Sequence, residues 1–129
     1  MNNLIQKALK SSCWAVAGAT RNTNKFGNRI YKRLKSEGYR VYPLNPVYSD
    51  VEGDLCYDSP SAFPETPDCV SMVISPSKGL LLLDPLYASG VRLLWFQPGA
   101  YDDEIINAAQ RKGFEVIYDH CVLVELNQR

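Results

Sequence analysis

The sequence predicts an α/β protein, a Rossmann-like three-layer sandwich whose mainly parallel five-stranded sheet carries helices on both faces. The first observation behind this prediction is that apolar, strand-like runs recur at residues 14–17, 41–44, 70–74, 92–96 and 114–118. The second is that segments with helical periodicity separate several of these runs. Strands that are joined through helices by short loops form parallel sheets with right-handed crossovers, and both faces of such sheets are covered.

The beginning of the alternating pattern is a strand, a glycine turn and a helix. Residues 14–17 form the apolar strand, Gly18 lies in the turn, and the helix is expected over about 25–36, closed by Gly38. Its apolar stripe consists of Ile30, Tyr31 and Leu34. This arrangement points backbone N–H groups and the positive end of a helix dipole at one spot, which suits a phosphate.

The second strand covers residues 39–44 and is ended by Asn45-Pro46. Residues 47–67 are rich in Pro, Asp, Ser and Gly, so we expect a loop there, with short regular structure around 55–57. Residues 69–74 are almost continuously apolar, which is typical of a strand that is buried on both faces.

The C-terminal half repeats the alternation. A helix over about 77–89 should be bent or split by Pro85. A buried strand follows at 91–96, and then a helix over 102–112, whose acidic first turn complements the helix dipole. The last strands are expected at 114–118 and 122–125.

Length and charge limit the possible functions. The chain has 129 residues, the size of one domain, in which residues 1–11 would be a lead-in helix or extension. Its formal net charge is zero, so no overall field favours nucleic acid or an anionic membrane. No apolar run approaches the roughly 18 residues of a membrane helix, and the start lacks the apolar core of a signal peptide. We therefore predict a cytoplasmic protein with neither nucleic acid nor membrane as partner; its oligomeric state is open.

The cysteines and the single histidine predict neither a metal site nor a catalytic residue. Four cysteines are widely spaced without a Cys-x-x-Cys pair, so we interpret them as reduced thiols that are mainly core residues: Cys13, Cys56, Cys69 and Cys121. His120 precedes Cys121 directly, and adjacent side chains on an extended chain point to opposite faces. A nucleophile and its base need to be within hydrogen-bond reach, so this pair predicts no catalysis.

The predicted sheet has its ligand crevice at the carboxyl ends of the strands, near the point where the strand order reverses. The residues that follow the strands there are small residues, prolines and amides, with little acid–base machinery: Gly18-Ala19-Thr20, Asn45-Pro46, Ser75-Pro76, Gln97-Pro98-Gly99 and Asp119-His120-Cys121. Such residues leave backbone N–H and C=O groups open to a ligand. The composition of this edge therefore predicts a binding crevice.

Two familiar nucleotide sites are disfavoured. A nicotinamide-binding turn requires Gly-x-Gly-x-x-Gly and an acidic residue after the second strand. The chain has Gly18 and then only Gly27, and Asn45-Pro46 takes the place of the acidic residue. NAD is therefore not the expected cofactor. The Walker pattern is also absent, so nothing predicts ATPase or kinase activity.

Several short motifs together carry a resemblance to a known family. They are Ala17-Gly18-Ala19-Thr20, Asn24-Lys25-Phe26-Gly27-Asn28-Arg29, Pro43-x-Asn45-Pro46, Cys56-Tyr57, Ile74-x-Pro76, Trp95-x-Gln97-x-Gly99 and Asp119-x-Cys121. In order and spacing the chain resembles the small stand-alone CoA-binding-domain proteins, which are similar to the N-terminal CoA-binding domain of the succinyl-CoA synthetase α subunit. The resemblance covers about residues 14–125.

The resemblance implies CoA or acyl-CoA as the ligand, lying across the carboxyl edge of the sheet. It implies that the turn approaches the phosphates and that a lysine and an arginine add positive charge. Asn45-Pro46 would flank the nucleotide, and Ser75-Pro76 would line the adenine side. The stretch from Gln97 to Gly99 would close the crevice. The implied binding residues are Gly18, Ala19, Thr20, Arg21, Lys25, Asn45, Pro46, Ser75, Pro76, Gln97 and Gly99.

The chain departs from the family pattern at three positions. One is Gly27, which stands in place of a serine at the start of the first helix and is tolerable there. Val47 stands where relatives usually have Lys or Arg, and His120 stands where they often have Arg. The phosphorylated histidine of the synthetase lies in a second domain, so the ligase activity does not transfer with the resemblance. Three functions stay open: a non-catalytic CoA or acyl-CoA binder, a small enzyme or regulatory subunit that uses another adenine-containing or phosphorylated ligand, and an interaction protein that has kept the fold without the ligand.

Overall fold

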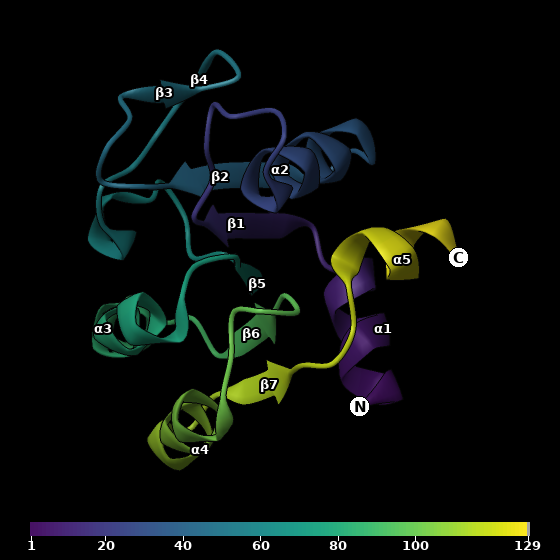
Figure 1. Cartoon of the computed structure of the whole chain (residues 1–129), viewed down its shortest axis with the longest axis vertical. Helices are drawn as coiled ribbons and strands as arrows, with labels where there is room; N and C mark the ends of the chain where they lie inside the picture. Colours follow the sequence, from purple (N-terminus) through teal and green to yellow (C-terminus); the bar gives the residue numbers. More distant parts are fainter. Residues whose placement is uncertain (129) are drawn as a thin grey trace.

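A computed structural model describes residues 1–128 and places a five-stranded parallel sheet at the centre of the protein, as Figure 1 shows. The strand order is β2-β1-β5-β6-β7. Its strands are β1 (Cys13–Ala17), β2 (Arg40–Leu44), β5 (Cys69–Met72), β6 (Leu93–Phe96) and β7 (Glu115–Ile117). The five predicted runs are therefore neighbouring parallel strands, and the 70–74 run supplies the central strand rather than an edge.

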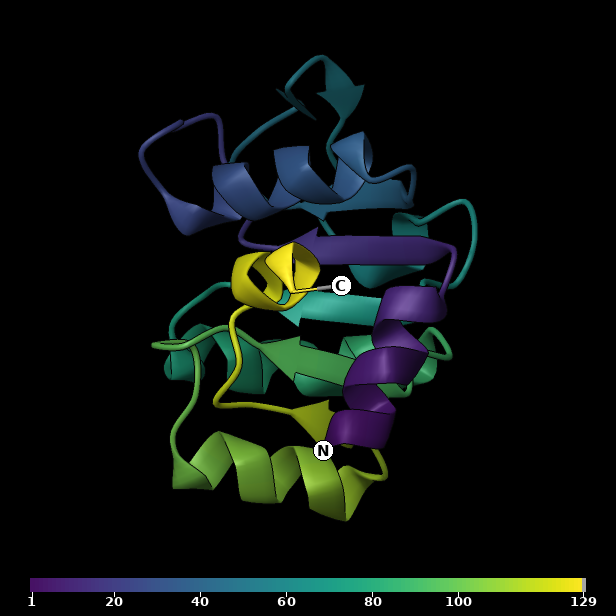
Figure 2. The same ribbon diagram turned by 90° about the vertical axis from the view of Figure 1, so that its right-hand side faces the viewer.

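Helices cover both faces of the sheet, which confirms the three-layer prediction. They are α1 (Asn2–Lys10), α2 (Phe26–Ser36), α3 (Pro76–Ala88), α4 (Asp103–Lys112) and α5 (Val122–Asn127). In Figure 2, α1 and α5 cross in front of the sheet. The loop between β2 and β5 carries an antiparallel pair, β3 (Asp50–Val51) and β4 (Asp54–Leu55), and the short 3-10 helix η1 (Pro60–Ala62).

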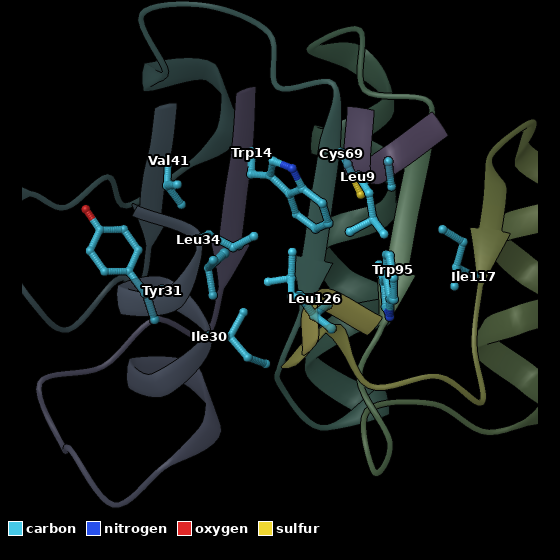
Figure 3. Packing of buried hydrophobic residues seen from close by; sticks show 14 of the residues in the cluster. Leu9, Trp14, Ile30, Tyr31, Leu34, Val41, Cys69, Trp95, Ile117 and Leu126 are labelled. Carbon is cyan, nitrogen blue, oxygen red and sulfur yellow. The ribbon is translucent and has the colours of Figure 1, made fainter. Parts of the chain in front are cut away.

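Alternation along β1 builds two separate cores. Trp14 and Val16 pack on the face covered by α1, α2 and α5, whereas Ala15 and Ala17 pack on the face covered by α3 and α4. Figure 3 shows the first core, in which Trp14 lies beside Trp95 at 5.9 Å between ring centroids. Because both faces are buried, each strand needs apolar residues at successive positions, and this is the pattern that the sequence shows.

The predicted strand at 122–125 is wrong, because these residues begin the helix α5. Val122 and Leu126, four residues apart, are the buried residues of α5 and pack against the first core. A short apolar segment of this kind fits either a strand or a buried helix, and the tertiary contacts select the helix.

Pro85 neither splits α3 nor ends it, since one helix runs from Pro76 to Ala88. A proline removes the hydrogen bond to the carbonyl four residues earlier, but Pro85 lies in the last turn, so few further bonds depend on it. The helix then stops at Ser89, and Gly90 has the positive φ that the sequence prediction of a closing glycine requires.

The order of the strands fixes where a ligand can lie. When the five strands of this sheet are counted from 1 to 5 along the chain, their order in the sheet is 2-1-3-4-5, which is typical of doubly wound proteins. The connections between strands change direction between β1 and β5. In such sheets the ligand crevice opens at this switch point, outside the carboxyl ends of the two strands. No helix within residues 1–128 is both long and apolar enough to cross a membrane.

Candidate functional site

A cleft of about 600 Å³ opens at the switch point between β1 and β5. The turn after β1, the start of α2, the loop after β2 and the start of α3 contribute its walls. We call it the cleft, and its lining residues are Gly18, Thr20, Asn24, Lys25, Phe26, Gly27, Asn45, Val47, Tyr48, Val73, Ile74, Ser75 and Lys78.

Gly18 forms the floor of the cleft and is required by the fold itself. Its φ of 92° lies in the left-handed region, and its N–H donates to the carbonyl oxygen of Leu44 at 3.0 Å. A Cβ atom at this position would lie 2.3 Å from the carbonyl oxygen of Val73. A side chain at Gly18 would therefore disturb the junction of β1 and β5, so replacing this glycine cannot test ligand contact separately from folding.

Two helices point their N-termini at the cleft without a capping side chain. Lys25 is the N-cap of α2 and Ser75 is the N-cap of α3, and within residues 1–128 no side chain accepts a cap hydrogen bond at either helix. Neither helix has an acidic residue in its first turn. The first N–H groups of a helix need an acceptor and carry partial positive charge, so both ends favour an anion.

The helix α4 has the opposite arrangement at its start. Its N-cap Asp102 accepts a hydrogen bond from the backbone N–H of Ile105 at 2.9 Å, and Asp103 and Glu104 occupy the first turn. The capping carboxylate satisfies this end and the acidic residues neutralise its charge. Of these three helices, only α2 and α3 begin in a way that leaves them suited to an anionic ligand.

The ionisable side chains that line the cleft are two lysines and one tyrosine. Lys25 and Lys78 line it from the two helix starts, and Tyr48 contributes its hydroxyl. None of the described lining residues carries a carboxylate, an imidazole or a thiol. The cleft can therefore bind an anion.

Polar side chains fix the shape of the cleft by holding its loops together. The side-chain amide of Asn45 donates to the carbonyl oxygen of Ala19 at 2.9 Å, and its Oδ1 accepts from the N–H of Val47 at 2.9 Å. The hydroxyls of Thr20 and Tyr48 lie 3.0 Å apart. These bonds connect the turn after β1 to the loop after β2 and hold the two segments together at the rim of the cleft.

A smaller apolar recess of about 340 Å³ adjoins the cleft and shares several residues with it. We call it the recess, and it is lined by Gly18, Leu44, Asn45, Pro46, Val47, Asp58, Ile74, Lys78, Leu81 and Leu82. Two of its side chains, Val47 and Leu81, are each 78% exposed. An aromatic ring or another flat apolar group could cover this surface, and such burial is favourable.

Six of the eleven residues predicted for binding lie at these two hollows. Five line the cleft and Pro46 lines the recess; the five are Gly18, Thr20, Lys25, Asn45 and Ser75. Pro76 is the first residue of α3, and Ala19 is fully buried beneath the turn; neither is among the lining residues.

The three other predicted residues are directed elsewhere or lie at another part of the edge. Arg21 donates from Nε to the carbonyl oxygen of Asp50 at 2.9 Å, pairs with the Asp50 carboxylate, and lies over the Tyr48 ring. Gln97 is buried and bonded to Cys121, and Gly99 is in an exposed turn after β6. Because the cleft lies between β1 and β5, the residues after β6 fall outside its lining.

Sequence reasoning did not include several lining residues among the binding residues. Lys78 had a usable signal, because a residue in the first turn of a helix that follows a strand lies near the carboxyl edge of the sheet. Tyr48 and Val47 lie in an irregular loop, and no periodic pattern places such residues. The remaining unlisted members are Asn24, Phe26, Gly27, Val73 and Ile74.

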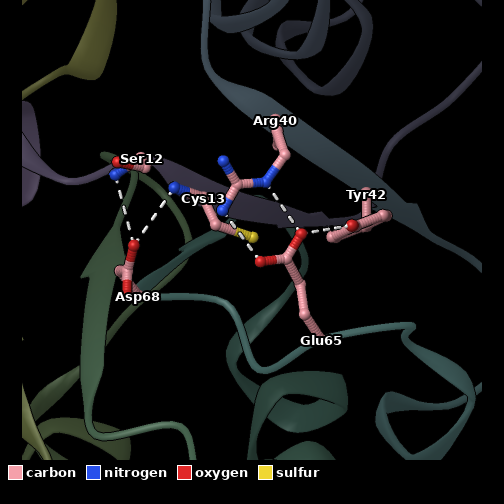
Figure 4. A network of polar contacts seen from close by, with 6 residues as sticks. All are labelled: Ser12, Cys13, Arg40, Tyr42, Glu65 and Asp68. Atoms are coloured by element: carbon pink, nitrogen blue, oxygen red, sulfur yellow. Dashed lines mark hydrogen bonds and ion pairs between the residues drawn. The ribbon is translucent and has the colours of Figure 1, made fainter.

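A separate polar cluster, drawn in Figure 4, lies at the opposite edge of the sheet, where β1 and β2 begin. The Arg40 guanidinium donates two hydrogen bonds to Glu65, at 2.8 and 2.9 Å, and the Tyr42 hydroxyl donates to the same carboxylate at 2.6 Å. These contacts lower the pKa of Glu65 to about 2. The cluster joins the loop before β5 to β2 and is remote from the cleft.

Metal chemistry has no candidate among the described residues. Residues 1–128 bring together no group of three or more His, Cys, Asp or Glu side chains that could hold a metal ion. The Nδ1 atom of His120 lies 3.4 Å from the carboxylate of Glu125, whereas the thiol of Cys121 contacts Gln97. The adjacent His120 and Cys121 thus have different partners.

A doubly wound sheet with an anion-suited cleft at its switch point defines a nucleotide-type ligand-binding domain. The sequence comparisons identify which one. The family model described as "CoA binding domain" matches residues 12–127, so the chain belongs to this family of CoA-binding domains.

Similar proteins fall into two groups, small single proteins and parts of large ligases. A conserved hypothetical protein of Pyrococcus furiosus has 37% sequence identity and a TM-score of 0.84, over 89% of this chain and 99% of that one. A hypothetical protein from Pyrococcus horikoshii has 25% identity and a TM-score of 0.91, over 98% of this chain and 89% of that one. An ADP-forming acetate–CoA ligase of Archaeoglobus fulgidus is 25% identical over 84% of this chain, which spans only 17% of that ligase.

Proposed function

We propose that this chain binds CoA or an acyl-CoA in the cleft and the recess, without catalysing a reaction. One observation carries the proposal: two helices, α2 and α3, point uncapped N-termini at one cleft, and each supplies a lysine there. Backbone N–H groups and cations together are what a phosphate requires. Membership of the CoA-binding-domain family supports CoA as the molecule that brings those phosphates.

The phosphate chain of CoA would lie over the turn at Gly18. Glycine lets a ligand approach the backbone closely, and the start of α2 lies directly beside this turn. Lys25 and Lys78 would then face the phosphates from opposite walls. Charge-assisted hydrogen bonds of this kind are about twice as strong as neutral ones.

The adenosine part of CoA would occupy the recess beside the cleft. Leu81, Leu82 and Pro46 offer apolar surface for the ring. The Asp58 carboxylate lines the recess from the loop after β4, not from the position directly after β2 where dinucleotide-binding proteins hold the ribose. The residue directly after β2 is Asn45, which supports CoA rather than NAD.

The lining of the cleft also supports a non-catalytic role. It has no carboxylate, imidazole or thiol among the described residues, and these side chains are common general bases and nucleophiles. Acetate–CoA ligase activity belongs to proteins of which this chain matches a small part. We further propose that the protein works in the cytoplasm. Its partner would be a small molecule, since its net charge of zero favours neither nucleic acid nor an anionic membrane.

Thermal denaturation with equal concentrations of CoA, acetyl-CoA, NAD and ATP tests this function. A ligand that binds the native state raises the melting temperature, and the stabilisation grows with the logarithm of the ratio of ligand concentration to Kd. We expect CoA and acetyl-CoA to raise it where NAD and ATP do not, and isothermal titration to give one site per chain. Equal shifts with all four would favour a general phosphate cleft, and no shift with any would favour an interaction protein that has kept the fold alone.

A further inference from the structure

Cys121 differs from the other cysteines of this chain in its surroundings. Cys13, Cys56 and Cys69 are buried, and burial raises the pKa of each thiol, in Cys13 to about 12. Cys121 is only half-buried, in the segment between β7 and α5. Because the thiolate is the reactive form, the three buried thiols are poorly suited to react with a molecule in solution.

Gln97 gives Cys121 a polar partner that is itself incompletely paired. Its side chain is 3% exposed, its Nε2 donates to the Cys121 sulfur at 3.1 Å, and its Oε1 has no partner among the described residues. With the amide turned over, the thiol could donate to Oε1, but Nε2 would then lack an acceptor. In either orientation one amide atom is unpaired. This atom is closed to solvent in the structure, so a polar group of a ligand would satisfy it only after the Gln97 side chain turns toward the surface.

Both residues lie at the same edge of the sheet as the cleft. Gln97 directly follows β6, as Gly18 directly follows β1, and β5 lies between these two strands. Two strand spacings separate them, about 10 Å. Gln97 also lies two residues after Trp95, which belongs to the core between the sheet and α2, so Gln97 is on the side of the sheet that α2 covers.

We propose that Cys121 is a thiol-exchange site, at which the chain captures the thiol end of the CoA bound in the cleft as a mixed disulfide. This inference rests on the proposed function. With the phosphates at Gly18, the long arm of CoA would run along the carboxyl edge toward β6. An amide of that arm would pair with the unpartnered atom of Gln97, and its terminal sulfur would meet Cys121.

The exchange requires an oxidised form of the ligand, a CoA disulfide. The Cys121 thiolate attacks one sulfur of this disulfide, so a bond between Cys121 and CoA forms as the original sulfur–sulfur bond breaks. The second CoA leaves as a thiolate, and the proton that Cys121 gave up neutralises it through solvent. The disulfide ligand is the oxidant, and no metal or further reductant takes part.

Intact-mass measurement of the whole reduced chain after exposure to CoA disulfide tests the proposal. We expect one CoA adduct per chain, located on Cys121 by peptide mapping and removed by dithiothreitol. Cys121→Ser should form none. Adducts spread over Cys13, Cys56 and Cys69, or no adduct at all, would overturn the inference.

A neutral probe, hydroxyethyl disulfide, separates capture of a bound ligand from general thiol reactivity. The ratio of the rates with CoA disulfide and with this probe should fall about tenfold in Lys25→Ala, because a charged contact to the ligand is lost. Lys32→Ala, an exposed position farther along α2, should keep the parent ratio. An unchanged ratio in Lys25→Ala would show that the cleft plays no part in the capture.

Gln97→Met tests the amide at similar side-chain volume. It should slow the reaction with CoA disulfide about tenfold, since a donor to the attacking sulfur and a partner of the ligand are both removed. A melting curve establishes that this buried variant folds, and a parent-like rate in a folded variant would contradict the assignment. Titration of reduced CoA into the parent chain under dithiothreitol tests the proposed function separately, because no adduct can form there. If reduced CoA binds under dithiothreitol but CoA disulfide gives no adduct in its absence, this inference alone is wrong.

Discussion

Gly27 lies directly against the backbone of Gly18, so that a Cβ atom added at Gly27 would be 2.1 Å from the carbonyl oxygen of Gly18. The turn that carries Gly18 is in turn packed on the end of β5, where Val73 leaves no room for a side chain. The floor of the cleft is therefore backbone packed on backbone. This packing brings the N-terminus of α2 to the switch point of the sheet.

Gly27→Ala should destabilise the protein, although alanine is normally the better helix residue by about 1 kcal/mol. The added methyl group has to displace the Gly18 carbonyl, and overpacking of this kind costs about 1–3 kcal/mol. Urea denaturation measures the difference in the free energy of unfolding. Asn107→Ala, at an exposed position of α4, is the control and should change that free energy little. A Gly27→Ala variant as stable as the parent would show that the turn is not tightly packed.

Lys25→Ala and Lys78→Ala should each weaken CoA binding. A charge-assisted hydrogen bond is worth roughly 1.5–3 kcal/mol before solvent screening reduces it, which corresponds to a loss of about tenfold to hundredfold in affinity. The loss should shrink as salt is added, because both side chains are exposed and ions screen them. Isothermal titration at two salt concentrations measures both effects.

Three substitutions serve as controls for the two lysines. His120→Ala should change CoA affinity little, because the imidazole faces Glu125. Arg21→Ala should cost less than Lys25→Ala, since the guanidinium is already paired with Asp50. Lys32→Ala removes an exposed charge from α2 away from the cleft. If Lys25→Ala bound CoA like the parent while His120→Ala did not, the placement of the site would be wrong.

Val47→Lys should strengthen CoA binding. Val47 is 78% exposed and lines both the cleft and the recess, so a lysine there adds a cation without crowding the core. Exposed charge pairs contribute about 0.2–1 kcal/mol, which predicts a gain of up to about fivefold at low salt. Leu55→Lys adds the same charge at an exposed position of β4 that lines neither hollow. Equal gains in both variants would mean that only the net charge matters.

Acid should remove a contribution of Glu65 to stability. Hydrogen bonds from Arg40 and then Tyr42 lower the pKa of this carboxyl from 4.5 to about 2. A carboxyl with a lowered pKa stabilises the folded state above its unfolded pKa, and the contribution disappears as the pH falls from 4.5 to about 2. Urea denaturation across this range should show a shallower loss of stability in Glu65→Gln than in the parent.

A double mutant separates the Glu65 pair from other acid-labile contacts. Arg40→Gln should reduce the pH dependence in the same window, because the first cause of the lowered pKa is removed. Glu65→Gln combined with Arg40→Gln should then add little to either single change, as residues in direct contact are not additive. Additive losses, or a parent-like pH profile in Glu65→Gln, would contradict this role.

Whether a helix or a strand could be predicted correctly from the sequence depended on the length of the segment. The strands are correct at 14–17, 41–44 and 70–74 to within a residue or two because continuous apolar runs bounded by loops have few other interpretations. The segment from Val122 to Glu125 is short and apolar, and it fits a strand as well as a helix. Packing of Val122 and Leu126 on the first core made it a helix.

By itself the sequence determined the α/β class, the parallel strands and the glycine turn before α2. The strands could be predicted because burial on both faces of the sheet requires continuous apolar runs, which can be recognised in the sequence alone. Which residues share the cleft was decided only by the tertiary structure. Lys78 joins Lys25 there, whereas Gln97 and Gly99 do not, although all of them follow strands at the same edge. The reason is the strand order, in which β1 lies next to β5 and not next to β6. Which strands are neighbours is decided by how the whole sheet packs, and no local pattern of residues predicts it.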